Sequence, residues 1–97
     1  MNKNELFDYI LRLVICETEV CPGQILSARK DTESVDARYL LVHYLVDAGF
    51  TPSSIAARTG IPERTVSNIQ TNFDTRLSTR KILRIQSENI RKKMGNN

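Results

Sequence analysis

The stretch Thr51–Phe73, TPSSIAARTGIPERTVSNIQTNF, predicts two short helices joined by a tight turn. Thr51 is a favoured N-cap residue, and Pro52 suits the first helical position, where no N–H is needed. Gly60 can adopt the left-handed conformation that ends a helix. Pro62 then starts the second helix. The stretch therefore contains a helix, a glycine turn and a second helix within one short segment.

The spacing of small and apolar residues around the turn is typical of a helix-turn-helix. Ala56 lies four residues before Gly60, and Val66 lies six residues after it. A small residue lets the two helices cross closely, and the later valine holds them together. In this motif the second helix, here about residues 62–73, lies in a DNA major groove. A plain helical hairpin without DNA contacts is the alternative reading of this pattern.

The second helix has one apolar face and one polar face. Val66, Ile69 and Phe73, spaced three and four residues apart, are expected to face inward. The opposite face carries residue types that bind base edges or phosphates, namely Arg64, Ser67, Asn68 and Thr71. Because this face has a single basic residue, further phosphate neutralisation is expected from Arg29, Lys30, Arg38 and the C-terminal helix.

The rest of the chain predicts an all-α, compact helical domain of five to six helices, spanning residues 1–97 as a single domain. A first helix is expected over residues 2–16, with a capping box formed by Asn2 and Glu5. A short helical piece begins at Pro22, and residues 27–31 form a basic loop. A central helix, capped by Ser34 and apolar on two sides, runs to residue 48. The last helix covers about residues 79–94 after a break at residues 74–78, and residues 95–97 are expected to fray.

Charge is distributed unevenly along the chain, although the net charge is only +3. Residues 1–75 hold seven Lys/Arg and ten Asp/Glu, whereas residues 76–97 hold seven Lys/Arg and one Glu, so the balances are −3 and +6. A basic C-terminal segment on a mildly acidic body suits a nucleic-acid partner, or self-association between the two parts. The last helix is expected to have both an apolar arc (Ile82, Leu83, Ile90, Met94) and a basic arc (Arg80, Arg84, Arg91). It could therefore contact DNA phosphates or form a homodimer.

Other classes of function find little support in the sequence. Cys16 and Cys21 lack the spacing and the histidine partners of a metal site, and reduced, partly buried thiols are expected. His43 has no nucleophile, second histidine or carboxylate at a useful spacing, so it is expected to be structural. No paired carboxylates or catalytic triad residues are recognisable, so we expect no enzyme, no small-molecule substrate, no metal and no cofactor. No segment has the length of a membrane span or the character of a secretory signal, so a cytoplasmic protein is expected.

From about Phe7 to Phe73 the chain resembles the C-terminal DNA-binding domain of the bacterial replication initiator DnaA, which belongs to the Trp-repressor-like helix-turn-helix group. Three stretches carry the resemblance in the same order, namely residues 25–30 (ILSARK), residues 37–45 (ARYLLVHYL) and residues 51–66 of the helix-turn-helix. They look like that family's basic loop, the start of its central helix and its DNA-reading motif.

The resemblance implies roles for individual residues. Arg29 matches the basic-loop arginine that enters the minor groove, Arg38 matches an arginine of the central helix, and Thr65 matches a threonine of the base-reading signature. The family's Gly-Gly-Arg-Asp-His-Thr-Thr run is one residue shorter here, at residues 60–65, and lacks the Asp-His pair. A different target sequence is therefore expected. The phosphate-loop motif of the initiator's ATPase module is also missing.

Two functions are consistent with these observations. The first is a double-stranded DNA-binding protein, a regulator of transcription or replication, with helix 62–73 in the major groove. Loop 28–30 would then lie on the adjacent backbone or in the minor groove. The second is a protein-interaction adaptor that keeps the fold without DNA contacts, which the low charge of the second helix and the acidic residues 1–75 favour.

Overall fold

A computed structural model of the chain describes residues 1–95. The helices are α1 (Lys3–Thr18), α2 (Pro22–Ile25), α3 (Thr32–Asp47), α4 (Pro52–Thr59), α5 (Glu63–Thr79) and α6 (Lys81–Gly95). No strand occurs in the described range, which confirms the expected all-α domain of five to six helices. Gly95, which was expected to fray, is instead the last residue of α6. The fraying expected of Asn96 and Asn97 lies outside the described residues.

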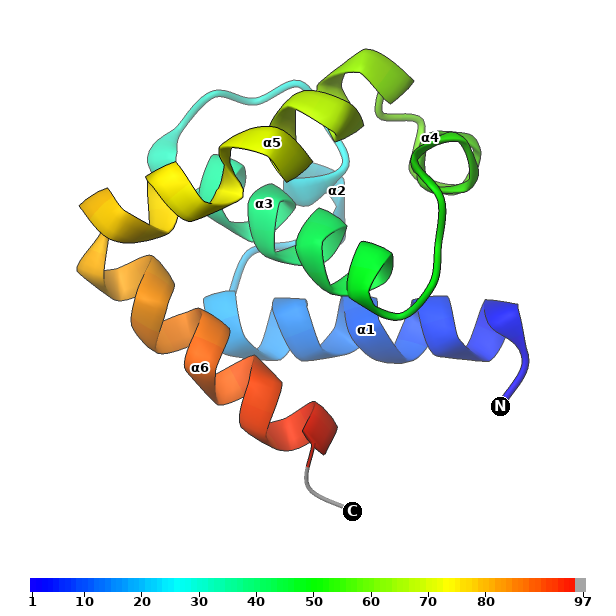
Figure 1. The fold of residues 1–97 in the computed structure, drawn as a ribbon, viewed down its shortest axis with the longest axis horizontal. Helices are drawn as coiled ribbons and strands as arrows, with labels where there is room; N and C mark the ends of the chain where they lie inside the picture. Colours follow the sequence, from blue (N-terminus) through cyan, green and yellow to red (C-terminus); the bar gives the residue numbers. More distant parts are fainter. Residues whose placement is uncertain (96–97) are drawn as a thin grey trace.

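The central helix α3 lies between α1 and α5, as Figure 1 shows, and also packs against α2 and α4. The side chains at its centre are fully buried, namely Leu40, Leu41, Val42 and Leu45. A helix with apolar residues on two sides loses water on both of them when neighbours cover both faces. The structure therefore confirms that this helix is the one around which the others pack.

The start of α1 confirms the predicted capping box. The Asn2 side chain accepts the Glu5 N–H at 2.9 Å, and the Glu5 carboxylate accepts the Asn2 N–H at 3.1 Å. These two bonds satisfy N–H groups that have no acceptor inside the helix. The apolar side of α1 buries Ile10 and Val14 against the core.

The start of α3 differs from the prediction, because Asp31 rather than Ser34 is the N-cap. The Asp31 carboxylate accepts both the N–H and the hydroxyl of Ser34, at 3.2 and 2.9 Å. Ser34 is fully buried one turn inside the helix. Both residue types are good caps, and a carboxylate at the earlier position also benefits from the helix dipole.

The end of α5 also differs from the prediction, since the helix continues through residues 74–78 and ends at Thr79. These residues include no glycine or proline, and Leu77 packs against the core. The chain turns at Arg80, whose backbone is extended. The Arg84 guanidinium then donates to the carbonyl oxygens of Leu77 and Ser78 at 2.7 and 3.1 Å, which satisfies the end of α5.

The packing of α6 corrects the predicted apolar arc. Leu83 and Ile90 are fully buried, and Met94 packs against the core. Ile82, expected in the same arc, is 61% exposed, and Ile85 is 51% exposed. α6 packs against both α1 and α5 (Figure 1). The positions of these two helices decide which side of α6 is buried, so some of its apolar residues remain exposed.

The two cysteines correct another expectation, because the free thiols of Cys16 and Cys21 are both exposed rather than partly buried. His43 is half-buried and stacks on Phe73, with ring centroids 3.8 Å apart. Burial lowers the pKa of His43, since the charged form loses hydration, while Asp47 and Asp74 oppose this shift. Within residues 1–95, no cluster of His, Cys, Asp or Glu side chains could hold a metal ion. None of the helices described is long and apolar enough to cross a membrane.

The glycine at the end of α4 gives a first testable prediction. Gly60 has a φ of 80°, which is the left-handed backbone conformation expected of a glycine that ends an α-helix. Its N–H donates to the Ala56 carbonyl. An added Cβ would meet no atom within 4 Å, so only the backbone opposes a side chain there. We expect Gly60→Ala to lower the free energy of unfolding by about 1–2 kcal/mol in urea denaturation.

The matched control for this substitution is Gly23→Ala. Gly23 lies in α2 without a positive φ, and an added Cβ there also meets no atom within 4 Å. We expect Gly23→Ala to leave stability unchanged or to raise it by up to about 1 kcal/mol. Equal effects of the two substitutions would show that the conformation of Gly60 does not matter for stability.

Candidate nucleic-acid interface

The turn between α4 and α5 is held by Thr59. Its hydroxyl donates to the Ile55 carbonyl at 2.7 Å and accepts the Ile61 N–H at 3.1 Å. Ile55 and Ile61 are both buried, so this short link is anchored on both sides of Gly60. The Thr51 hydroxyl caps α4 by accepting the Ser54 N–H, as predicted. The angle at which α5 leaves α4 is therefore fixed by a compact, buried turn.

The two faces of α5 are arranged as the sequence predicts. Val66 is fully buried, and Ile69 and Phe73 are each 4% exposed. The predicted contact residues lie on the exposed side of the helix, with Arg64, Ser67, Asn68 and Thr71 exposed and Thr65 half-buried. The helix begins at Glu63, with Pro62 as its N-cap. The structure therefore presents one continuous polar face in the first half of α5.

The basic loop between α2 and α3 is held in place by its own side chains. The Ser27 hydroxyl donates to the Gln24 carbonyl at 2.9 Å and accepts the Arg29 N–H at 3.3 Å. The Arg29 Nε donates to Asp31 at 2.9 Å, although the Arg29 side chain remains 56% exposed. Hydrogen bonds from Ser34 are the main reason that the pKa of Asp31 is lowered, and Arg29 adds to them. The cap of α3 thus also orients the loop arginine.

Arg38 has a structural role that the sequence did not reveal. Its side chain is buried, its Nε donates to the Ile25 carbonyl at 2.8 Å, and its Nη2 donates to the Gln24 carbonyl at 3.2 Å. Burial lowers the pKa of Arg38, since the guanidinium loses hydration, and Asp31 opposes this shift. Arg38 thereby attaches the end of α2 to α3. A contact between Arg38 and DNA stays a prediction.

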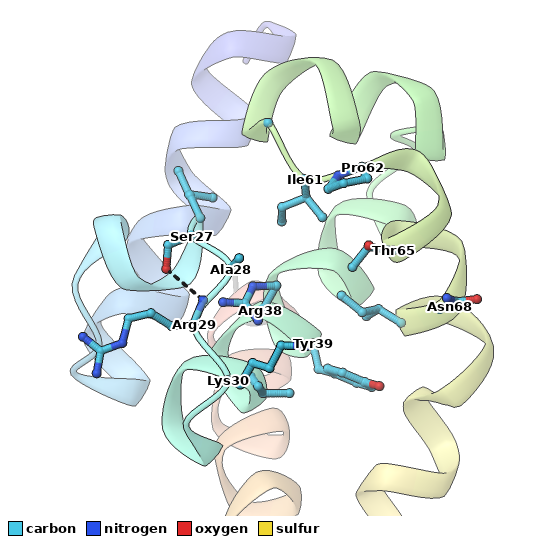
Figure 2. Close-up of a pocket in the computed structure, with 14 residues that line it drawn as sticks. Ser27, Ala28, Arg29, Lys30, Arg38, Tyr39, Ile61, Pro62, Thr65 and Asn68 are labelled. Atoms are coloured by element: carbon cyan, nitrogen blue, oxygen red, sulfur yellow. Dashed lines mark hydrogen bonds between the residues drawn. The ribbon is translucent and has the colours of Figure 1, made fainter.

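A hollow of about 480 Å³ separates the basic loop from the start of α5. Figure 2 shows Arg38 between the loop and α5, with Thr65 on the opposite wall. Its lining includes five of the predicted site residues, namely Arg29, Lys30, Arg38, Thr65 and Asn68. The other three, Arg64, Ser67 and Thr71, lie on α5 outside the hollow. The basic loop and the start of α5 therefore face each other across one concave surface.

The basic residues near the C-terminus are mostly engaged within the protein. Arg76 and Arg80 both pair with Asp36, Arg91 pairs with Glu88, and Lys93 lies 3.8 Å from Glu17. Arg84 caps α5, as described above. Of the seven basic residues at positions 76–95, Lys81 and Lys92 have no ion pair or hydrogen bond from their side chains. In the expected basic row on α6, Arg80 and Arg91 are thus paired with carboxylates. Arg84 binds only carbonyl oxygens and keeps its net charge, as do Lys81 and Lys92.

Asp36 is the residue whose importance the sequence analysis missed. Its side chain is 5% exposed, and it accepts hydrogen bonds from the Arg76 Nε at 2.8 Å and the Arg80 Nε at 2.8 and 3.0 Å. The Arg76 guanidinium also lies 5.0 Å from the centre of the Tyr39 ring. These partners are 40 and 44 positions away from Asp36, so no local pattern could have indicated them.

Comparison of the chain with known protein families, with characterised proteins and with solved structures finds no match. The resemblance to the DNA-binding domain of DnaA therefore stays a prediction that rests on the residues quoted above.

Proposed function

We propose that this protein binds double-stranded DNA as a regulator of transcription or replication. The first half of α5 would lie in the major groove, with Arg64, Ser67, Asn68 and Thr71 facing bases and nearby phosphates. The loop at residues 28–30 would contact the adjacent backbone or minor groove. The observation that carries this proposal is the single concave surface between the basic loop and an exposed polar helix face.

The charge distribution limits how tightly such a surface binds. Arg29, Lys30 and Arg64 are the exposed basic side chains at the proposed interface. Each Lys or Arg that neutralises a DNA phosphate releases counterions, and this release dominates affinity at low salt. Because few such residues are present, we expect weak binding to random sequences and a modest dependence of affinity on salt.

Fluorescence anisotropy with a random-sequence duplex, titrated at several salt concentrations, tests this proposal. The logarithm of the association constant is expected to fall linearly with the logarithm of salt concentration. Each phosphate contact contributes about 0.9 to the magnitude of this slope. A slope of about 3 would agree with the three exposed basic residues. An absence of binding at low salt would contradict the proposal.

Arg29→Ala should weaken DNA binding to every sequence alike. The side chain lies on an exposed loop and is suited to a phosphate or minor-groove contact, which carries little base information. We expect the salt slope to fall by about one unit, measured by the same anisotropy titration with two unrelated duplexes. Arg12→Ala, on the exposed side of α1, is the matched control and should leave both quantities unchanged. A changed order of preference between the duplexes would contradict the role given to Arg29.

A protein-interaction adaptor is the second candidate function, and one observation favours it. Ile82 and Ile85 lie one turn apart on α6 and are 61% and 51% exposed. Exposed isoleucines at this spacing are suited to a partner helix, including α6 of a second copy. Analytical ultracentrifugation tests the homodimer directly, and Ile85→Glu should then shift the protein to monomer. A monomer would exclude the homodimer, and DNA binding at low salt would contradict an adaptor that lacks DNA contacts.

A further inference from the structure

The hollow between the basic loop and α5 contains a buried positive charge without a negative partner. Arg38 is 8% exposed, and within residues 1–95 no carboxylate forms an ion pair with it. Its Nε and Nη2 donate to carbonyl oxygens. Nη1 has no acceptor in the described residues and remains reachable from solvent, so it is free to bind a ligand. Asp31, which only partly opposes the lowering of the Arg38 pKa by burial, already accepts hydrogen bonds from Arg29 and Ser34.

A buried guanidinium of this kind favours an anion. Removing a charge from water is costly unless a counter-charge or hydrogen bonds compensate for it. Two carbonyl oxygens supply hydrogen bonds to Arg38 but carry no net charge. An anionic group in the hollow would supply the missing charge and could accept from Nη1. Guanidinium groups bind carboxylates and phosphates through parallel N–H donors.

The opposite wall of the hollow adds donors for the same group. α5 begins beside the hollow, and its N-cap Pro62 provides no side-chain acceptor for the first N–H groups. The N-terminus of a long helix attracts negative charge through these free N–H groups and the helix dipole. Thr65 lies on this wall, where its hydroxyl makes no hydrogen bond within the described residues.

A second part of the lining is apolar and favours an apolar body for the rest of the ligand. It is formed by Leu26, Val35, Tyr39, Ile61, Pro62 and Ile69. Such walls favour a flat, apolar or aromatic body. A volume of about 480 Å³ lies within the usual range of small-molecule sites, about 300–1,000 Å³. Arg29 and Lys30 also border the hollow and favour negative charge in it.

We propose that this hollow binds a small organic anion, a phosphate or carboxylate carried by a flat apolar body, with the anionic group between Arg38 and Thr65. This site does not depend on DNA binding. Its regulatory consequence does rest on the proposed function. A ligand there occupies the space between the basic loop and α5, and we expect it to weaken duplex binding.

The site is tested first without DNA, by two-dimensional ¹H–¹⁵N NMR of the full chain at constant ionic strength. The test compounds are adenosine 5′-monophosphate and benzoate, and their uncharged counterparts are adenosine and benzamide. At least one anion is expected to give saturable shifts in residues 27–30, in Ile61 and Thr65, and in the Arg38 Nε–H. The uncharged counterpart should bind at least tenfold more weakly. No saturation by either anion, or equal binding of an anion and its uncharged counterpart, would overturn the proposal.

Variants identify the anion-binding group. Arg38→Gln is expected to weaken anion binding by roughly tenfold or more, since it removes a charged hydrogen-bond donor. Thr65→Val removes only a hydroxyl from the wall of the hollow and should weaken anion binding severalfold. This variant still tests the site if Arg38→Gln does not fold. Arg12→Gln, on the exposed side of α1, is the matched control and should bind normally. Unchanged anion binding in Thr65→Val and in a folded Arg38→Gln would also overturn the proposal.

The anionic group could belong to a free small molecule or to a DNA phosphate. The anisotropy titration with duplex DNA, repeated with and without the bound anion, distinguishes these two sources. A free anion that saturates the hollow and lowers duplex affinity supports both the site and its regulatory role. Saturation without any effect on the duplex supports the site and contradicts the regulatory role. If the same residues respond to duplex DNA but to neither free anion, the hollow accepts a DNA phosphate and the small-molecule site is wrong. A protein that binds the anion but no DNA would contradict only the proposed function.

Discussion

Replacing Asp36 by Asn is expected to lower the free energy of unfolding by about 2–4 kcal/mol. Asp36 is buried on α3 and binds Arg76 at the end of α5 and Arg80 at the bend before α6. Asparagine keeps the shape of the side chain but removes the charge that both guanidinium groups need. The Arg76 and Arg80 side chains are 25% and 31% exposed, so they regain some hydration. The expected loss is therefore below that of a fully buried ion pair.

Urea denaturation at neutral pH measures this loss. Glu33→Gln is the matched control, because Glu33 is an exposed carboxylate on the first turn of the same helix. We expect Glu33→Gln to change stability by no more than about 0.5 kcal/mol. If the two substitutions cost the same, the paired arginines do not hold α3, α5 and α6 together.

Arg64→Ala is expected to relax the sequence preference of DNA binding at one position of the site. Arg64 is exposed in the first turns of α5, where a side chain can reach base edges in the major groove. A bidentate contact between arginine and guanine contributes about 1–3 kcal/mol of discrimination. Loss of this contact should leave affinity for random sequences within severalfold of the wild type, because only one phosphate-neutralising charge is removed.

Selection of preferred sites from a randomised duplex pool measures this effect in the wild type and in Arg64→Ala. Gln70→Ala is the matched control, since Gln70 is exposed on α5 but borders a smaller hollow beside His43, away from the basic loop. It should leave the selected site unchanged. Unselective losses of similar size from Arg64→Ala and Arg29→Ala would contradict the separate roles given to these two residues.

Local features of the fold were predictable because each depends on residues close together in the chain. The capping box of Asn2 and Glu5, the caps of α4 at Thr51 and Gly60, and the buried stripe of α5 all follow from spacings of three or four residues. The exposed polar face of α5 follows from the same periodicity. Its predicted DNA contacts stay predictions.

Two differences show where local patterns were insufficient. Ser34 and Asp31 are both suitable caps, and the choice of Asp31 depended on its additional bond to Arg29 and on the burial of Ser34. Residues 74–78 contain polar residues typical of a break, yet α5 continues because Arg76 and Leu77 find partners in the core. At α3 the burial of Ser34, and at α5 the contacts with distant residues, decided between two locally acceptable conformations.

The sequence by itself determined the helices, the glycine turn between α4 and α5, and the face that α5 exposes, since periodicity and capping act within a few residues. Only the tertiary structure decided how the charges are used. It buried Arg38 beneath the basic loop. It also paired Asp36 with Arg76 and Arg80, which lie 40 and 44 positions later in the chain. The physical reason is that the residues around an arginine in the sequence do not show whether its guanidinium binds a carbonyl oxygen, a carboxylate or solvent. Its partner is set by packing between distant helices.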